Sequence, residues 1–318
     1  MKPLRYIKHL FLHDRNTRYL LKQVLTNTEE EINLVKEESI LRRIDYFNDK
    51  CMHDSSIGIS HEKLCDDEVI VSLTSYGERI NEVYLPIESI MQGTVKPNRI
   101  ILWLSEEEFK GKRLPLTLQK QQQRGLQIEY CKDIKSYKKI IPAMQKYPDA
   151  CVITIDDDVM YGFDLVENLV NCHKANPEAI CANRIHRIKT DERKRPLSYL
   201  QWGMEIKTKK TSNLNFLTGV GGNLYPAHCF IDESFDEQKF MGLCPFGDDI
   251  WINAMIWMSN KKIVQSYTHS DRGRDYIEVR TFQKDALCNQ NTNAKECRND
   301  TQIKAVFEQY NLYHYLSE

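Results

Sequence analysis

The sequence has no apolar run long enough to cross a membrane as a helix. Nowhere in its 318 residues do the ~18 to 20 consecutive apolar residues of a spanning helix occur. The first 23 residues are interrupted by His9, His13, Asp14 and Arg15, so they lack the apolar core of a signal peptide. These absences predict a soluble protein that stays in the cytoplasm.

The chain also lacks an excess of either charge. Its 44 basic and 45 acidic residues leave a net charge of -1, which produces no overall field to attract nucleic acid. The composition, 41% hydrophobic and 28% charged, is that of a globular protein. No nucleic-acid partner is therefore expected.

Cysteines are present, but not in the spacings that mark a disulfide framework or a zinc finger. None of the ten cysteines belongs to a CxxC pair, and Cys288 with Cys297 has no second pair to complete a metal site. A chain of this length can bury a large core without covalent cross-links. Reduced thiols, and hence a reducing compartment, are the expectation.

Positive charge is concentrated only in the N-terminal segment. Residues 1–23 carry six basic residues against one acidic residue, interleaved with leucine, isoleucine and phenylalanine. This pattern is typical of an interfacial helix attracted to anionic lipid, which could contact the inner membrane peripherally. A solvated helix that docks on its own domain is at least as good an interpretation.

Short apolar runs alternate with amphipathic stretches from Glu68 onward. Strands are predicted at 70–74, 100–104, 127–131, 151–155 and 180–182, and helices at 83–92, 116–124, 137–147 and 163–175. This alternation predicts an α/β fold with a mostly parallel sheet flanked by helices. We expect a helical N-terminal extension at 1–66, a main domain at 67–275, and a C-terminal loop and helix at 276–318 that pack on it.

Three consecutive aspartates, Asp156, Asp157 and Asp158, follow the predicted strand at 151–155. In open α/β sheets, ligands bind at the carboxyl ends of strands. Side chains two residues apart in an extended segment point the same way, so Asp156 and Asp158 can share one hard cation while Asp157 faces away or caps a turn. A divalent ion would offset the repulsion among them. The alternative is a solvated turn or helix cap.

A second acidic pair, Asp248 and Asp249, precedes an apolar helical run that ends at Met258. One carboxylate can cap this helix, which leaves the other to accept a proton from a hydroxyl. The glycine-rich stretch 218–223 predicts a close-packing loop beside a sugar, or a plain turn. His269 follows a strand-like segment, where its imidazole could bind the same cation.

Six ordered blocks resemble glycosyltransferases of the GT-A fold, and more closely those of bacterial capsule and surface polysaccharide synthesis. They are VSLTSYGERI (71–80), IILWL (100–104), SYKKIIPAM (136–144), ITIDDDVMY (153–161), TGVGGNLYP (218–226) and FGDDIW (246–251). The resemblance implies a Rossmann-like GT-A catalytic domain over 67–275. The N-terminal residues and the region beyond about residue 275 have no counterpart in it.

The resemblance implies a nucleotide-diphosphate sugar as donor, with a UDP-sugar expected, and Mn²⁺ or Mg²⁺ as cofactor. By position, Asp156 and Asp157 would lie toward the ribose and the metal, and Asp158 between the metal and the diphosphate. The resemblance also implies a nucleobase pocket lined by Thr74, Ser75, Tyr76 and Arg79. Lys139 would be the basic residue near the diphosphate, and Asp249 or Asp248 the acid on the acceptor side.

The predicted activity is the transfer of a hexosyl or N-acetylhexosaminyl group to a hydroxyl of a glycan or lipid-linked acceptor. A metal-dependent phosphoesterase is the alternative from another reaction class, although such sites usually intersperse several histidines with the acids. A third interpretation is a glycan-binding protein that kept the fold and lost turnover. The intact triple aspartate argues against this third interpretation.

Overall fold

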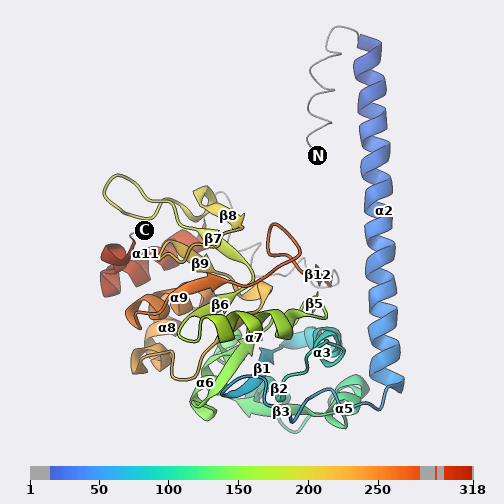
Figure 1. Ribbon diagram of the computed structural model, residues 1–318, viewed down its shortest axis with the longest axis horizontal. Helices are drawn as coiled ribbons and strands as arrows, with labels where there is room; N and C mark the ends of the chain where they lie inside the picture. The colour runs from blue at the N-terminus through green and yellow to red at the C-terminus, as the bar shows by residue number, and fades with distance from the viewer. Residues whose placement is uncertain (1–14, 280–290, 292–296, 317–318) are drawn as a thin grey trace. The chain divides into compact units, whose positions relative to one another are not determined.

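The chain divides into two compact units, Met1–Asp49 and Lys50–Glu318, and the computed structural model describes residues 15–279, 291 and 297–316. One long helix, α2 (Arg15–His53), makes up the described part of the first unit and is drawn in blue in Figure 1. It confirms the helical N-terminal extension, but it ends at His53 rather than near residue 66. Residues 1–14, which hold part of the basic segment, lie outside the described residues. No helix within the described ranges is long and apolar enough to cross a membrane.

A seven-stranded sheet forms the framework of the second unit, in the spatial order β11-β6-β10-β4-β1-β2-β3. Its strands are β1 (Glu68–Thr74), β2 (Arg99–Ser105), β3 (Leu126–Cys131), β4 (Ala150–Thr154), β6 (Ile180–Ala182), β10 (Asn223–Tyr225) and β11 (Ile263–Gln265). All neighbours pair in parallel except β10, which runs antiparallel to both β4 and β6. All five predicted strands lie in this sheet, and the predicted α/β fold class is confirmed.

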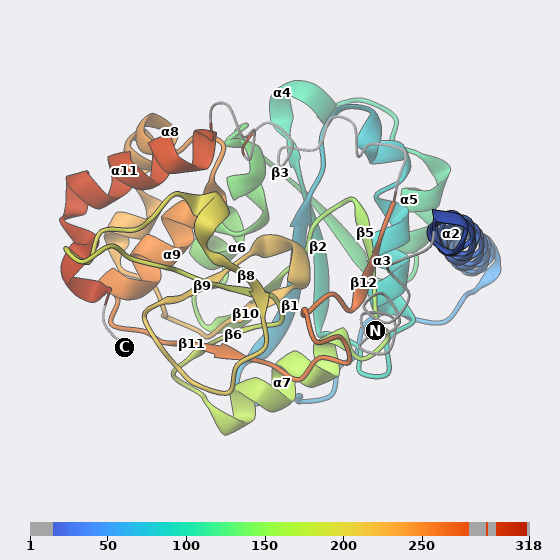
Figure 2. The ribbon, with the colours of Figure 1, turned by 90° about the horizontal axis from the view of Figure 1, so that it is seen from above.

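Helices cover both faces of this sheet, as Figure 2 shows. One face packs against α6 (Ile141–Lys146), α8 (Glu237–Leu243), α9 (Asp248–Met258) and α11 (Arg298–Tyr310), and the other against α3 (Tyr84–Met91), α5 (Leu116–Gln122) and α7 (Leu165–Ala175). Successive strand residues point to opposite faces. Ile70 and Val152 therefore enter the first core, whereas Val71 and Ile153 enter the second.

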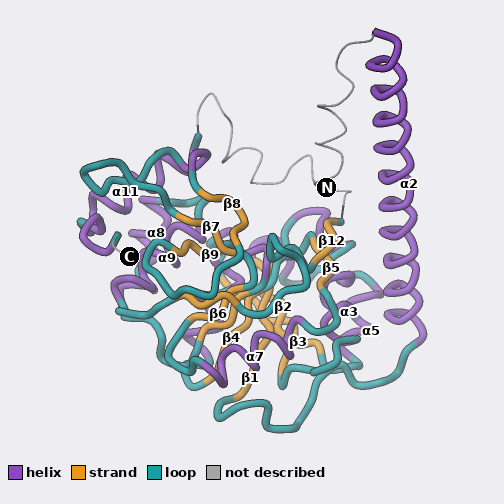
Figure 3. Tube along the Cα trace, turned by 45° about the horizontal axis from the view of Figure 1, so that its top comes forward, coloured by secondary structure: helices purple, strands orange, loops and turns teal. Residues whose placement is uncertain are grey.

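Two smaller antiparallel sheets complete the unit. In one, β5 (Val159–Tyr161) pairs with β12 (Tyr276–Glu278); in the other, β7 (Ile185–Arg187) lies between β8 (Gly203–Ile206) and β9 (Asn215–Leu217). Figure 3 draws these strands in orange, and β9 contacts α9. The sequence pattern did not predict these sheets, because strands of three or four residues are too short to reveal a period of two.

The helix predicted at 137–147 is instead two elements, the 3-10 turn η2 (Lys135–Lys139) and α6. Proline has no N–H and clashes with the carbonyl four residues before it, so a helix cannot continue through Pro142 without cost. The chain breaks at Ile140, and Pro142 sits near the start of α6. The Lys139 carbonyl, freed by this break, accepts a hydrogen bond of 2.6 Å from Ser72 Oγ on β1.

A buried ion pair joins α3 to the residues that follow α5. Both carboxylate oxygens of Glu88 accept hydrogen bonds of 2.9 Å from Arg124 Nη1, and Gln121 donates to the same carboxylate at 3.0 Å. The Glu88 side chain is 0% exposed and that of Arg124 only 3%, so water cannot screen the pair. Arg124 also donates to the Ser56 carbonyl at 2.9 Å, which anchors the segment that leads to β1.

Replacing Glu88 by alanine should lower the free energy of unfolding by about 3–5 kcal/mol, because it leaves the buried guanidinium with only the more distant carboxylate of Asp54, 3.9 Å from Arg124 Nη2. Urea unfolding followed by circular dichroism measures this change. The matched control is Glu106→Ala, which breaks the exposed pair with Lys110 and should cost at most about 1 kcal/mol. Equal losses in the two variants would contradict the assignment.

Candidate active site

The acidic loop and the segment after β1 leave the same edge of the main sheet. This follows from the parallel pairing of β1 with β4, in which Ser72 lies opposite Thr154. A cavity of about 740 Å³ opens at this edge. Nine of the candidate residues line it: Thr74, Tyr76, Arg79, Lys139, Asp156, Asp157, Asp158, Asp248 and Asp249.

On one side of the cavity, Arg79 joins two of the three consecutive aspartates. Its Nη1 donates to Asp157 Oδ1 at 2.8 Å and lies 3.1 Å from Asp158 Oδ2. The other oxygen of Asp157 accepts a hydrogen bond of 2.7 Å from Ser75. Burial alone would lower the pKa of Arg79, but Asp157 and Asp158 raise it above its usual value, so the guanidinium stays charged. Both carboxylate oxygens of Asp157 accept hydrogen bonds, one from Ser75 and one from Arg79. Asp157 therefore helps to hold the loop after β4 in place.

On the other side, the Lys139 ammonium lies between two acidic segments. Its Nζ is 2.8 Å from Asp156 Oδ1 and 2.9 Å from Asp248 Oδ2. Lys139 is 8% exposed, and burial favours the neutral amine. The carboxylates of Asp156, Asp248 and Asp249 nonetheless raise the pKa of Lys139 well above its usual value, so the side chain is charged. This lysine therefore connects the loop after β4 with the start of α9.

The glycine-rich stretch closes over this lysine. Gly219 N donates to Asp249 Oδ1 at 2.9 Å, and Asp248 Oδ1 accepts a hydrogen bond of the same length from Ser136. A Cβ atom on Gly219 would lie only 2.7 Å from Lys139 Nζ and 3.1 Å from Asp249 Oδ1. A side chain at this position would therefore displace the Lys139 ammonium from its place between the carboxylates.

The cluster carries more negative than positive charge. Five aspartates face Arg79 and Lys139, which leaves three excess negative charges when all groups are ionised. Burial and the neighbouring Asp156 and Asp157 raise the pKa of Asp158 to about 6. Burial and Asp248 raise the pKa of Asp249 to about 7. A divalent cation would relieve this repulsion, and carboxylate oxygens are the ligands that Mg²⁺ and Mn²⁺ prefer.

The carboxylates offer part of a coordination shell rather than a closed cage. Among the described residues, no group donates a hydrogen bond to Asp156 Oδ2 or Asp158 Oδ1, so both oxygens can bind a ligand. In the same part of the chain, no three of the aspartates bring their oxygens within 4.8 Å of one another. Mg²⁺ commonly takes one or two protein carboxylates and completes its shell with phosphates and water. The residues therefore fit an ion that binds together with a phosphorylated ligand.

His269 lies away from this cluster. Its Nε2 is 2.6 Å from Asp164 Oδ2 at the start of α7, and its side chain is 63% exposed. The hydrogen bond and charge of Asp164 raise the pKa of His269 above its usual value. The imidazole is therefore paired with Asp164 and does not line the 740 Å³ cavity.

A further wall of the cavity comes from the three-stranded sheet and was not predicted from the sequence. Arg184 Nη2 is 2.8 Å from Glu205 Oε1, and Arg274 Nε donates to the same oxygen at 2.8 Å. Glu205 has a φ of +51°, which is uncommon for a residue with a side chain. Its backbone N–H donates to His186 Nδ1 at 2.9 Å. Arg184, Arg274 and His186 thus hold Glu205, with its unusual backbone conformation, beside the site.

His186 is neutral in this environment. Burial, with a smaller contribution from Arg184, lowers the pKa of His186 to about 3. The same wall presents Tyr199, Leu200, Met204 and Phe216 to the cavity. It therefore combines aromatic and apolar surface with a few polar groups, a mixture common where proteins bind small molecules.

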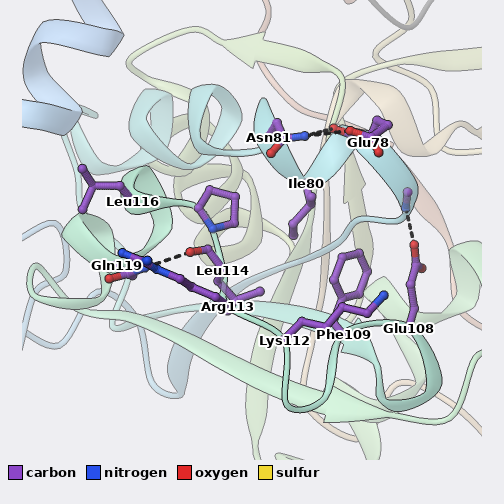
Figure 4. A pocket seen from close by; sticks show the side chains of 12 residues that line it. Glu78, Ile80, Asn81, Glu108, Phe109, Lys112, Arg113, Leu114, Leu116 and Gln119 are labelled. Carbon is purple, nitrogen blue, oxygen red and sulfur yellow. Dashed lines mark hydrogen bonds between the residues drawn. The ribbon is translucent and has the colours of Figure 1, made fainter.

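A second cavity of about 550 Å³ is lined by the segment after β1 and by the residues around the start of α5, as Figure 4 shows. A hydrogen bond of 2.7 Å from Gly77 N to Glu108 Oε1 lies between the two cavities, and Glu108 lines both. The second cavity has Lys112, Arg113 and Glu78 on its surface but none of the five aspartates. The candidate active site is therefore the larger cavity, which the five aspartates line.

No protein-family model matches the chain, and no curated protein matches it in sequence. Among solved structures, it is similar to CMP:2-keto-3-deoxy-manno-octonic acid synthetase in complex with CTP, with 12% sequence identity and a TM-score of 0.36. The match covers 64% of this chain and 92% of the other. Values this low say nothing about the substrate or reaction of this chain.

Gly219→Ala should lower the free energy of unfolding by roughly 1–3 kcal/mol, because the added methyl group overlaps Lys139 Nζ and Asp249 Oδ1. Urea unfolding again provides the measurement. Gly242→Ala is the control: it lies in α8 with no atom within 4 Å of the added Cβ, and it should gain up to about 1 kcal/mol. A Gly219→Ala protein as stable as the wild type would show that the loop is not tightly packed.

Proposed function

We propose that this chain is a metal-dependent glycosyltransferase of the GT-A type. It would move a sugar from a nucleotide-diphosphate donor, a UDP-sugar being expected, to a hydroxyl of a glycan or lipid-linked acceptor. The observation that carries this proposal is the cavity at the carboxyl ends of β1 and β4, where five aspartates outnumber the two cations that hold them. An open, acidic, partly ligated site suits a substrate that brings its own phosphates with a divalent ion.

Asp156 and Asp158 are the residues that would hold the Mn²⁺ or Mg²⁺. Each keeps a carboxylate oxygen to which no described residue donates a hydrogen bond. When bound, the ion neutralises the negative charge that develops on a departing nucleoside diphosphate. Arg79 keeps the Asp158 carboxylate in place, and Asp157 in turn keeps Arg79 in place. These contacts preorganise the loop so that little rearrangement is needed during the reaction.

The donor would lie across Thr74, Tyr76, Arg79 and Lys139. Tyr76 is 44% exposed and lines the cavity, and the Arg79 guanidinium lies 5.2 Å from the centroid of its ring. An aromatic side chain can stack on a nucleobase. Ser75 acts indirectly, through its hydrogen bond to Asp157. The buried ammonium of Lys139 would stabilise the leaving diphosphate.

Asp249 is the better of the two acids to accept a proton from the acceptor hydroxyl. Asp248 has both oxygens occupied, one by Ser136 and the other by Lys139. The carboxylate of Asp249 accepts a hydrogen bond only from Gly219 N among the described residues, at Oδ1, so Oδ2 is left to face an acceptor. The wall with Leu200 and Met204, which are 44% and 38% exposed, would then contact the acceptor.

A thermal-shift panel tests the donor class. UDP, GDP, CDP and CMP are each added over a series of rising concentrations, up to about 100-fold the dissociation constant of any that binds, with Mn²⁺ and without it. One nucleoside diphosphate should raise the melting temperature by roughly 5–10 °C, and only with the metal. Indifference to every nucleotide would reject the proposal. Stabilisation without transfer of sugar to any glycan acceptor would favour a catalytically silent binding protein.

Asp158→Asn should lower metal-dependent turnover by about 10²-fold or more while the protein stays folded, because a charged ligand to the ion is lost. The matched control is Asp164→Asn, which removes the partner of the exposed His269 and should leave turnover near that of the wild type. Release of nucleoside diphosphate from the sugar nucleotide, measured in a coupled assay, compares the two. Full activity in Asp158→Asn would place the site elsewhere.

The two acids of α9 should differ in their effects. Asp249→Asn removes the proposed base and should lower kcat by about 10²–10⁴-fold with little change in the affinity for donor. Asp248→Asn should act mainly through Lys139, raising the KM for donor. The reverse order of effects would assign the base to Asp248.

A further inference from the structure

Three buried metal-binding side chains meet at the edge of the sheet opposite the candidate active site. Cys65 precedes β1, Cys151 lies at the start of β4, and His173 is in the last turn of α7. Their sulfur and nitrogen atoms all lie within 4.8 Å of one another, and all three residues are buried. Cys151 and Asp156 are five residues apart along extended chain, about 16 Å. The cluster is therefore separate from the acidic site.

The distances suit a tetrahedral ion. Cys151 Sγ is 3.5 Å from His173 Nε2 and 3.9 Å from Asp67 Oδ2. Zinc binds sulfur at about 2.3 Å and nitrogen at about 2.0–2.1 Å, so tetrahedral geometry separates the two ligand atoms by about 3.6 Å. One ion could therefore reach Cys151 and His173 without movement of the backbone.

His173 takes part in the cluster through Nε2, the ring nitrogen that lies 3.5 Å from Cys151 Sγ. His173 is only 6% exposed, and its Nδ1 has no hydrogen-bond partner among the described residues. A buried polar atom without a partner costs roughly 1–3 kcal/mol. An ion at Nε2 does not pair Nδ1, so the binding free energy of the ion has to outweigh this cost.

The ligand types select the metal. We propose that Cys65, Cys151 and His173 bind one zinc ion, with the carboxylate of Asp67, whose Oδ2 lies 3.9 Å from Cys151 Sγ, as the fourth ligand. Two thiolates and an imidazole form a set that zinc prefers, whereas Mg²⁺ and Mn²⁺ prefer the oxygen ligands of the acidic site. Each thiol releases its proton to solvent when the ion binds. The zinc ties the segment before β1, the start of β4 and the end of α7 together, which is a structural role.

Metal content of the full chain tests this site. The protein is purified without a metal-affinity tag, dialysed against EDTA and analysed by inductively coupled plasma mass spectrometry. One zinc per chain should remain in the wild type and in Asp158→Asn. Zinc should be lost from Cys65→Ser and from His173→Gln, and kept in the control Cys229→Ser, which changes a buried cysteine outside the cluster.

Cobalt substitution in the wild type decides the matter if the Cys65 and His173 variants fail to fold. Co²⁺ in place of zinc should give thiolate-to-metal charge-transfer absorption and the visible bands of a tetrahedral site. Two results would overturn the proposal. One is metal-free protein whose two thiols are both alkylated after denaturation, and the other is a disulfide between Cys65 and Cys151. Neither result bears on nucleotide binding, so the glycosyltransferase proposal stands or falls separately.

Discussion

The ammonium group of Lys139 holds together the two acidic segments on which the candidate site is built. Asp156 belongs to the loop after β4 and Asp248 to the start of α9, and each lies within 3 Å of the same nitrogen. A buried charge is tolerated only when it is paired and hydrogen-bonded. The positive charge of Lys139 and the negative charges of Asp156 and Asp248 stabilise one another, and this contact fixes where the two acidic segments lie.

Several distant features of the chain serve this one contact. The break before Pro142 frees the Lys139 carbonyl, which Ser72 then fixes to β1. Gly219 allows its loop to approach within 3 Å of Asp249. The antiparallel strand β10 follows this loop directly and pairs with β4, so the loop is held beside the aspartates. Together these contacts explain how several negatively charged side chains can lie close to one another in a largely buried site.

The two edges of the main sheet have different chemistry. At the carboxyl ends of β1 and β4, carboxylates outnumber basic side chains, and these groups line the larger cavity. At the opposite ends, two thiols and an imidazole are closed off from solvent. Hard oxygen ligands and soft sulfur ligands bind different metals, so the proposed ions would not compete for the same site. A structural ion at the starts of the strands would also keep their far ends in register.

The five main strands, the acids after β4 and the acidic start of α9 could be predicted from the residues alone, because apolar runs and helix-start signals are local patterns. The pairing of Lys139 with Asp248, the contact of His269 with Asp164, and the cluster of Cys65, Cys151 and His173 became visible only in the folded chain. Those contacts depend on the order and direction of strands, which no short window of sequence encodes. The wall formed by β7, β8 and β9 was not predicted for a further reason: its strands are too short to show the alternation of apolar and polar residues that marks a strand.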